Sequence, residues 1–135
     1  MNTVYRLKDD QKNIADIQRA TKTTDEFGIE PTHGLFGSDE WWRNIATGQL
    51  VLQTLKGVIS SVYMSGHNDW PEFEMVDENG NKSSWTRVAN SQELDNSYQA
   101  GHSIELDFVV QRHRTKSWDR GAETKCVVEV RISDA

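Results

Sequence analysis

The dipeptide formed by Asn79 and Gly80, with segments containing apolar residues on both sides, most restricts how this chain can fold. Asn-Gly readily takes up the positive φ angles of a tight hairpin turn, so the flanking segments are predicted to be two antiparallel strands. Counting outward from a two-residue turn, or from a four-residue turn over 78–81, places Glu74 opposite Trp85. The sequence therefore predicts a hairpin centred on this turn.

Side chains alternate between the two faces of a strand, and this alternation predicts what each side of the hairpin carries. Phe73 and Met75 share one side, which we expect to face the core. The other side then carries carboxylates, an indole and a guanidinium: Glu72, Glu74, Trp85 and Arg87. This register predicts that Trp85 is exposed and lies among carboxylates.

Further strands are predicted on both sides of the hairpin. Residues 104–111 and 125–132 alternate apolar and polar side chains, and a long segment beginning at residue 49 is interrupted by Gly57. A glycine inside a strand marks a bulge or a sharp bend, by which a strand turns the corner of a barrel. The resulting five strands follow an order that resembles the OB-fold. The predicted fold class is therefore mainly β, a small five-stranded OB-like or related open barrel.

The N-terminal part of the chain, residues 1–37, is predicted to be a helical or flexible arm. Residues 8–21 in this arm match a helix with only a thin apolar stripe. After the arm, Ser38 is suited to cap one short helix before the first strand, and Gly48 is suited to end it. A chain of 135 residues is normally one domain, so residues 38–135 are predicted to form a single barrel domain.

Composition narrows the class of partner. The chain has 15 Lys and Arg against 21 Asp and Glu, a formal net charge of −6, which works against nonspecific binding to nucleic acid or membranes. The single cysteine, Cys126, is consistent with a reducing compartment. No apolar run approaches the roughly 20 residues that span a bilayer, so the cytoplasm is the predicted location. The sequence has no phosphate-binding loop or dinucleotide motif, and we predict no cofactor.

Exposed aromatic residues are the first candidate for a functional site, because tryptophan is enriched at interface hot spots. Of the five tryptophans, Trp41 is expected in the core. The predicted partner-binding residues come from the hairpin and the loops around it: Trp85, Arg87, Glu72, Glu74, Trp70 and Trp118. We therefore predict a noncatalytic binding module that recognises a protein partner or another copy of itself.

A basic loop over residues 112–125 gives an alternative prediction, the binding of single-stranded nucleic acid. Cationic side chains there could contact phosphates while an indole stacks on a base, as in OB-folds that hold single strands. The residues concerned are Arg112, Arg114, Lys116, Trp118 and Arg120. Repulsion of phosphates by Glu72 and Glu74 weakens this alternative.

A second alternative is a small hydrolase-like or metal site. His67 and Asp69 are two residues apart, and Glu72 follows them, a combination that can bind a metal ion or transfer protons. A single histidine among carboxylates is also an ordinary surface composition, so no catalytic residue or metal ligand is assigned. The parity of the last strand predicts that Cys126 is a core thiol.

Three segments resemble those of short, uncharacterised bacterial proteins of the mobile gene-cassette (integron) type. They are GSDEWW at 37–42, DWPEFE at 69–74 and SSWTR at 83–87, within a resemblance that covers residues 34–132. It implies a compact bacterial domain and no known activity, so no functional residue is transferred from it.

Overall fold

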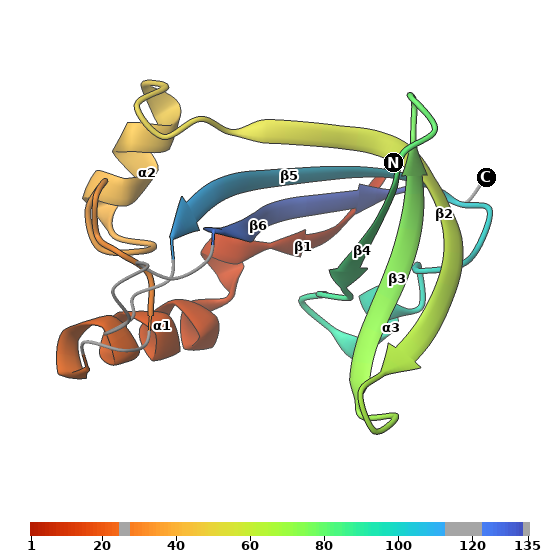
Figure 1. Cartoon of the computed structure of the whole chain (residues 1–135), viewed down its shortest axis with the longest axis horizontal. Coiled ribbons are helices and arrows are strands. Elements are labelled where there is room, and N and C mark those ends of the chain that lie inside the picture. Colours follow the sequence, from red (N-terminus) through yellow and green to blue (C-terminus); the bar gives the residue numbers. More distant parts are fainter. Residues whose placement is uncertain (25–27, 113–122, 134–135) are drawn as a thin grey trace. The chain divides into compact units, whose positions relative to one another are not determined.

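The computed structural model describes residues 1–24, 28–112 and 123–133, and its strands form one sheet in the order β1-β6-β5-β2-β3-β4 (Figure 1). The strands described are β1 (Asn2–Arg6), β2 (Gln53–Ser65), β3 (Trp70–Asp77), β4 (Lys82–Thr86), β5 (Ser103–Arg112) and β6 (Glu123–Ile132). The helices described are η1 (Leu7–Asp9), α1 (Gln11–Thr23), α2 (Asp39–Ala46) and α3 (Gln92–Asp95). The predicted mainly β class is confirmed. β1 and β4 end the strand order, so the sheet of described strands is open, and the finer OB-fold assignment stays a prediction.

The described strands number six, not five, because the N-terminal arm begins with a strand. β1 pairs antiparallel with β6, and its register shifts between Thr3 and Tyr5. The adjacent residues Val4 and Tyr5 are both buried, so this five-residue strand shows no regular alternation by which it could be predicted. The predicted division into an arm, 1–37, and a barrel domain, 38–135, stays a prediction, although β1 comes from the first part and β6 from the second.

Residues of the chain cluster into two compact units. The first takes Met1–Arg6, Thr54–Asp107 and the described residues from Glu129 onward. The second takes the described residues of Leu7–Gln53 and Phe108–Val128. The hairpin and its surroundings belong to the first unit, and α1 and α2 belong to the second.

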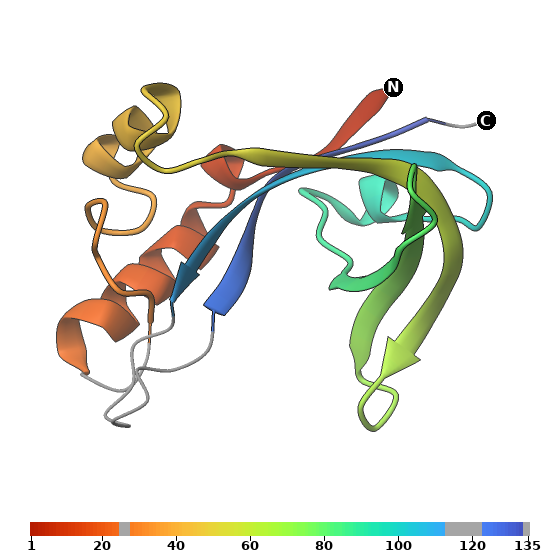
Figure 2. The ribbon, with the colours of Figure 1, turned by 45° about the horizontal axis from the view of Figure 1, so that its top comes forward.

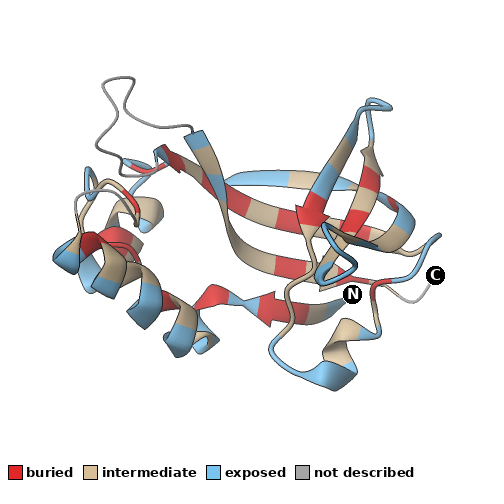
Figure 3. Cartoon of the chain, turned by 60° about the horizontal axis from the view of Figure 1, so that its bottom comes forward, coloured by how far each residue is buried: buried red, intermediate tan, exposed pale blue. Residues whose placement is uncertain are grey.

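The core of the first unit lies on the side of β3 that carries Phe73 and Met75, which are both fully buried as predicted. Figure 3 shows buried and less buried residues alternating along the strands. Phe73 packs against Tyr98 with ring centroids 5.0 Å apart, and the Tyr98 hydroxyl donates to the Val88 carbonyl (2.7 Å). Burial disfavours the phenolate and raises the pKa of Tyr98 well above its ordinary value.

The β3–β4 hairpin turns through three residues, 78–80, between Asp77 and Asn81. The Asp77 N–H donates to the Asn81 carbonyl (2.9 Å), and the Gly80 N–H donates to the Asp77 carbonyl (3.0 Å). The Asp77 carboxylate accepts from the N–H groups of Asn79 (2.9 Å) and Asn81 (3.0 Å). Within this turn Gly80 alone has a positive φ, +82°, whereas a two-residue Asn-Gly turn of type I′ needs it at both positions.

This odd loop length makes the predicted register wrong by one residue on β4. Phe73 pairs with Trp85, and Glu74 pairs with Ser84. A shift of one residue moves every side chain of a strand to the opposite face. Trp85 therefore shares the buried side of the hairpin with Phe73.

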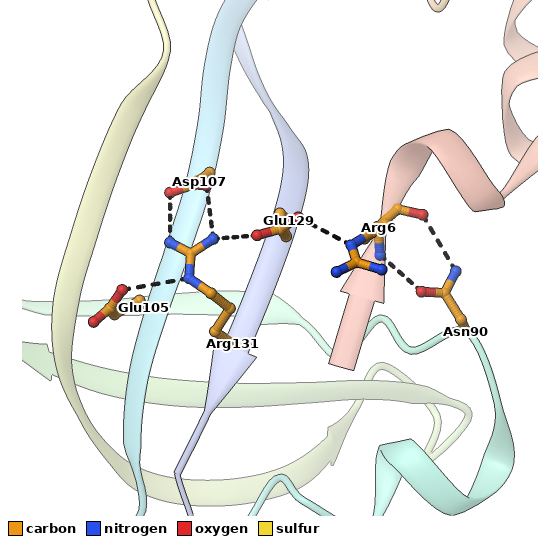
Figure 4. Close-up of polar contacts among 6 residues, drawn as sticks. All are labelled: Arg6, Asn90, Glu105, Asp107, Glu129 and Arg131. Atoms are coloured by element: carbon orange, nitrogen blue, oxygen red, sulfur yellow. Dashed lines mark hydrogen bonds and ion pairs between the residues drawn. The ribbon is translucent and has the colours of Figure 1, made fainter. Parts of the chain in front are cut away.

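The free edge of β1 is covered by Asn90, which follows β4 in the chain. The Asn90 backbone N–H donates to the Val4 carbonyl (3.1 Å). Its side chain accepts from the Arg6 N–H (2.7 Å) and donates to the Arg6 carbonyl (3.2 Å), as Figure 4 shows. One asparagine thus occupies three backbone groups of an edge strand, which limits pairing with another chain there.

The long strand β2 is bent (Figure 2). Within it, Gly57 lies where the backbones of β2 and β3 come close together. The predicted bulge falls slightly later, because the β2–β3 register shifts between Ile59 and Ser61. A Cβ placed at Gly57 would lie 2.1 Å from the Val76 carbonyl oxygen. The glycine is therefore needed for this close approach.

Replacing Gly57 with alanine should destabilise the fold by about 1–3 kcal/mol, because the β2–β3 pair must move apart to admit the methyl group. Urea unfolding followed by circular dichroism measures the change. Ser84→Ala, at an exposed position of β4, is the control and should shift stability by less than about 0.5 kcal/mol. Equal midpoints for the two variants would contradict the role given to Gly57.

The second unit is built around Trp41 of α2. Ser38 caps this helix as predicted, with its hydroxyl accepting from the Trp41 N–H (3.3 Å). The Trp41 ring is completely buried and packs against Phe36 and Trp42, each with ring centroids 4.8 Å away. Its Nε1–H donates to Gln111 Oε1 (3.0 Å), so the indole is both packed and hydrogen-bonded.

Candidate partner-binding site

The outer face is the side of β2, β3 and β4 that points away from Phe73 and Met75. Cross-strand pairing places eleven residues on it: Val58, Ser61, Tyr63, Ser65, Trp70, Glu72, Glu74, Val76, Lys82, Ser84 and Thr86. Three of the predicted partner-binding residues, Trp70, Glu72 and Glu74, lie on this face together, at alternate positions of β3. The whole outer face belongs to the first compact unit.

Trp70 is the most exposed aromatic side chain among the described residues, at 55%. It begins β3 directly after the turn that follows β2. Its Nε1–H donates to the Thr86 hydroxyl on β4 (3.0 Å). This bond restrains an indole whose remaining surface is open, which is the preorganised state expected of a binding residue.

Glu72 and Glu74 continue the outer face along β3. Tyr63 and Thr86 flank Glu72, and Ser61 and Ser84 flank Glu74. The Glu74 carboxylate accepts from the Ser60 hydroxyl (2.8 Å). In the part of the chain that the structure describes, neither carboxylate forms an ion pair. Among the described residues, the charges of Glu72 and Glu74 therefore have no ion-pair partner.

Tyr63 and Val58 belong to the outer face but were not predicted as site residues. They are five residues apart, and a regular strand would place them on opposite faces. The bulge between Ile59 and Ser61 brings them to the same face. The two adjacent serines at 60 and 61, inside the otherwise apolar segment 58–64, were the available signal for this irregularity.

The predicted exposure of Trp85 is wrong. Its side chain is only 7% exposed, and its Nε1–H donates to the Ser83 hydroxyl (2.8 Å). The odd hairpin loop places it opposite Phe73, on the buried side. Trp85 stabilises the hairpin and does not contribute to an exposed recognition surface.

Arg87 does not pair with Glu72 across the strands, as the predicted register required. Thr86 occupies the position opposite Glu72, and Arg87 lies beside Pro71, to whose carbonyl its N–H donates (3.0 Å). Its guanidinium contacts the Met64 sulfur (3.4 Å). Among the described groups, its buried Nε has no hydrogen-bond partner.

Most of the predicted nucleic-acid site lies outside the described residues. This applies to Arg114, Lys116, Trp118 and Arg120, and Trp118 was also a predicted partner-binding residue. Arg112 is described and exposed, and its guanidinium lies 3.8 Å from the Glu123 carboxylate. That alternative stays a prediction.

His67 and Asp69 are exposed in the turn between β2 and β3, whereas Glu72 lies on β3 itself. The described residues contain no group of three or more His, Cys, Asp or Glu side chains placed to hold a metal ion. The structure therefore gives no observation in favour of the hydrolase-like or metal alternative.

Cys126 is half-buried on β6, and burial raises the pKa of its thiol to about 11. Since the thiolate is the reactive form, alkylation by iodoacetamide at pH 8 should be about 100-fold slower in the folded protein than in urea. Mass spectrometry of timed samples measures both rates. Equal rates would show that the thiol is ionised as readily as in an unfolded chain.

A charged cluster that was not predicted lies on β1, β5 and β6 (Figure 4). The Arg131 guanidinium binds both oxygens of Asp107 (2.9 and 3.0 Å), one oxygen of Glu105 (3.3 Å), and Glu129. Arg6 binds the other oxygen of Glu129 (3.3 Å). Alternate charged residues on the last two strands of the sequence were a signal that could have located this cluster. Each of its carboxylates, unlike those of the outer face, already binds a guanidinium.

Asp107 is the most buried carboxylate of this cluster. Burial alone would raise its pKa, but hydrogen bonds from Arg131 and Thr54 (2.7 Å), together with the charge of Arg131, outweigh that effect. The pKa of Asp107 therefore lies below its usual range. Hydrogen bonding with Asp107 in turn raises the pKa of Arg131.

Comparison with known proteins gives one family. The sequence model described as “Immunity protein RhsI2” matches residues 1–133. No curated protein sequence matches the chain. The relation to mobile gene cassettes stays a prediction. The helices described in the structure are all too short or too polar to cross a membrane.

Proposed function

The chain belongs to the RhsI2 immunity protein family, and from this premise we propose that it binds a toxin protein and keeps that toxin inactive. The family match carries the proposal, because it extends over 133 of the 135 residues and so includes both compact units. An immunity protein acts by occupying its toxin and needs no catalytic group of its own. This agrees with the predicted noncatalytic binding module.

The protein offers enough surface for such a complex. A stable protein–protein interface buries about 800 Å² on each partner. The accessible surface of this chain is 8118 Å², so one face of the molecule, about a tenth of the surface, is sufficient. The outer face, with its exposed indole and unpaired carboxylates, is the described surface with the features of a binding hot spot. The cytoplasm stays the predicted location.

Co-expression with the toxin domain of an Rhs protein from the same strain tests the proposal. The toxin alone should stop growth, and co-expression of this chain should restore it. The purified proteins should co-elute as one complex in size-exclusion chromatography with light scattering. Failure both to protect cells and to form a complex would reject the proposed function. A homodimer of the chain alone, with no toxin bound, would favour self-recognition instead.

A further inference from the structure

We infer that the outer face is the surface that contacts the toxin, and that the toxin presents a basic surface to it, with arginine or lysine side chains against Trp70, Glu72 and Glu74. This inference rests on the proposed function and adds to it the location of the interface and the chemistry of the partner.

Charge is the first argument for a basic partner. Glu72 and Glu74 lie on the central strand of the outer face, and neither forms an ion pair within the described part of the chain. Of the eleven residues that define the face, Lys82 is the one cation, and it lies beside Val76 at the far end. Covering two carboxylates costs free energy unless the partner supplies opposite charge. A neutral or acidic partner would leave both without compensation.

The position of Trp70 is the second argument. Glu72 is two residues further along the same face, roughly 7 Å away along the strand. A guanidinium stacked on the indole is therefore within reach of this carboxylate, and arginine combines both kinds of contact. The Trp70 Nε1–H donates to the Thr86 hydroxyl (3.0 Å), so the ring is already restrained and loses little conformational freedom when the partner binds.

Two valines extend the outer face beyond the carboxylates. Val58 is 44% exposed and pairs with Val76 across β2 and β3. Both valines line a hollow of about 330 Å³, whose wall also includes Lys56 and Glu78. Protein–protein interfaces usually have apolar side chains at the centre and polar or charged side chains at the rim.

The charged cluster around Arg131 is the competing surface, but it offers less to a cationic partner. Glu105, Asp107 and Glu129 all bind Arg131, and Glu129 also binds Arg6 (Figure 4). An incoming cation would have to displace these contacts. A cation can bind the carboxylates of the outer face without breaking an ion pair among the described residues.

Binding of the purified Rhs toxin domain by three variants tests the inference. Trp70→Ala should weaken the complex by about 30-fold or more, as expected for a hot-spot tryptophan. Glu72→Gln combined with Glu74→Gln should slow association by about 10-fold at low salt and reduce its dependence on ionic strength. Glu40→Gln combined with Glu93→Gln removes the same charge from exposed positions elsewhere. This control should change the association and dissociation rates by less than about twofold.

Unchanged urea midpoints for all variants show that losses of affinity arise at the interface. If the wild-type chain binds the toxin and the Trp70 and glutamate variants bind equally well, the inference is overturned while the proposed function stands. If the glutamate variant and its charge-matched control lose affinity equally, overall charge and not the outer face is responsible, which also overturns it. If the wild-type chain does not bind the toxin, both the inference and the proposed function fail.

Discussion

Trp41→Ala should lower the free energy of unfolding by about 3–5 kcal/mol, the range for deleting a large aromatic side chain from a core. Trp41 has no exposed surface and contacts Phe36 and Trp42 through its ring. Its removal also leaves the buried Gln111 Oε1 without its indole donor, while Gln111 Nε2 already lacks a partner among the described groups. Urea unfolding monitored by circular dichroism measures the loss.

Two other variants separate the causes of this effect. Trp42→Ala removes an indole next in sequence that is only partly buried, and its loss should be clearly smaller. Trp41→Phe keeps most of the packing but removes the hydrogen bond to Gln111, so it should cost about 1–3 kcal/mol. If Trp41→Ala costs no more than Trp42→Ala, α2 does not depend on this core.

Arg131→Met should cost about 3 kcal/mol at pH 7, the lower end of the range for breaking a buried ion pair. The substitution leaves Glu105, Asp107 and Glu129 close together without the guanidinium that binds all three. The lower end applies because these side chains keep 13–30% of their surface exposed, where solvent screens the repulsion.

The effect of Arg131→Met should depend on pH with a defined sign. In the wild-type protein the pKa of Asp107 is lowered by folding, so its contribution to stability is present above the unfolded pKa, about 3.9, and is lost as pH falls through the folded value. Without Arg131, burial and neighbouring carboxylates raise the pKa of Asp107. Protonation then relieves the repulsion, so the stability gap between variant and wild type should narrow from pH 7 to about pH 4.

Unfolding curves in urea at several pH values provide this test. Arg6→Met is the matched control, because Arg6 is largely exposed and makes one ion pair in the cluster. Its cost should stay below about 1 kcal/mol, as for a surface ion pair. A constant gap between Arg131→Met and wild type across this pH range would contradict the electrostatic explanation.

Features determined by neighbouring residues could be predicted from the sequence. Ser38 and Gly48 are local signals for the ends of a short helix, and α2 begins at the predicted place. Alternation predicted the strands of the sheet other than β1, and the buried side of β3. Glu72 and Glu74 lie on one face as predicted, because their positions depend only on the parity of β3. Trp70 was predicted as exposed in the preceding loop, and it joins them because β3 begins at this residue.

Features determined by a single inserted residue could not be predicted by counting. The hairpin loop has an odd number of residues, and this reverses the parity of Trp85 and Arg87. Asp77 was the missed signal, since Asp at the first position of a type I turn favours this longer loop when Gly is at the fourth. The register shifts in β1 and β2 likewise break the alternation of side chains, so β1 and the face on which Tyr63 lies could not be predicted from it.

Asn90 affects whether this protein aggregates at high concentration. Copies of the protein meet one another wherever it is concentrated. Side-by-side joining of sheets is a common route to aggregates, and it begins at strands whose backbone groups are free. The asparagine side chain occupies both backbone groups of Arg6, so Asn90→Ala should make the protein more prone to precipitate at high concentration.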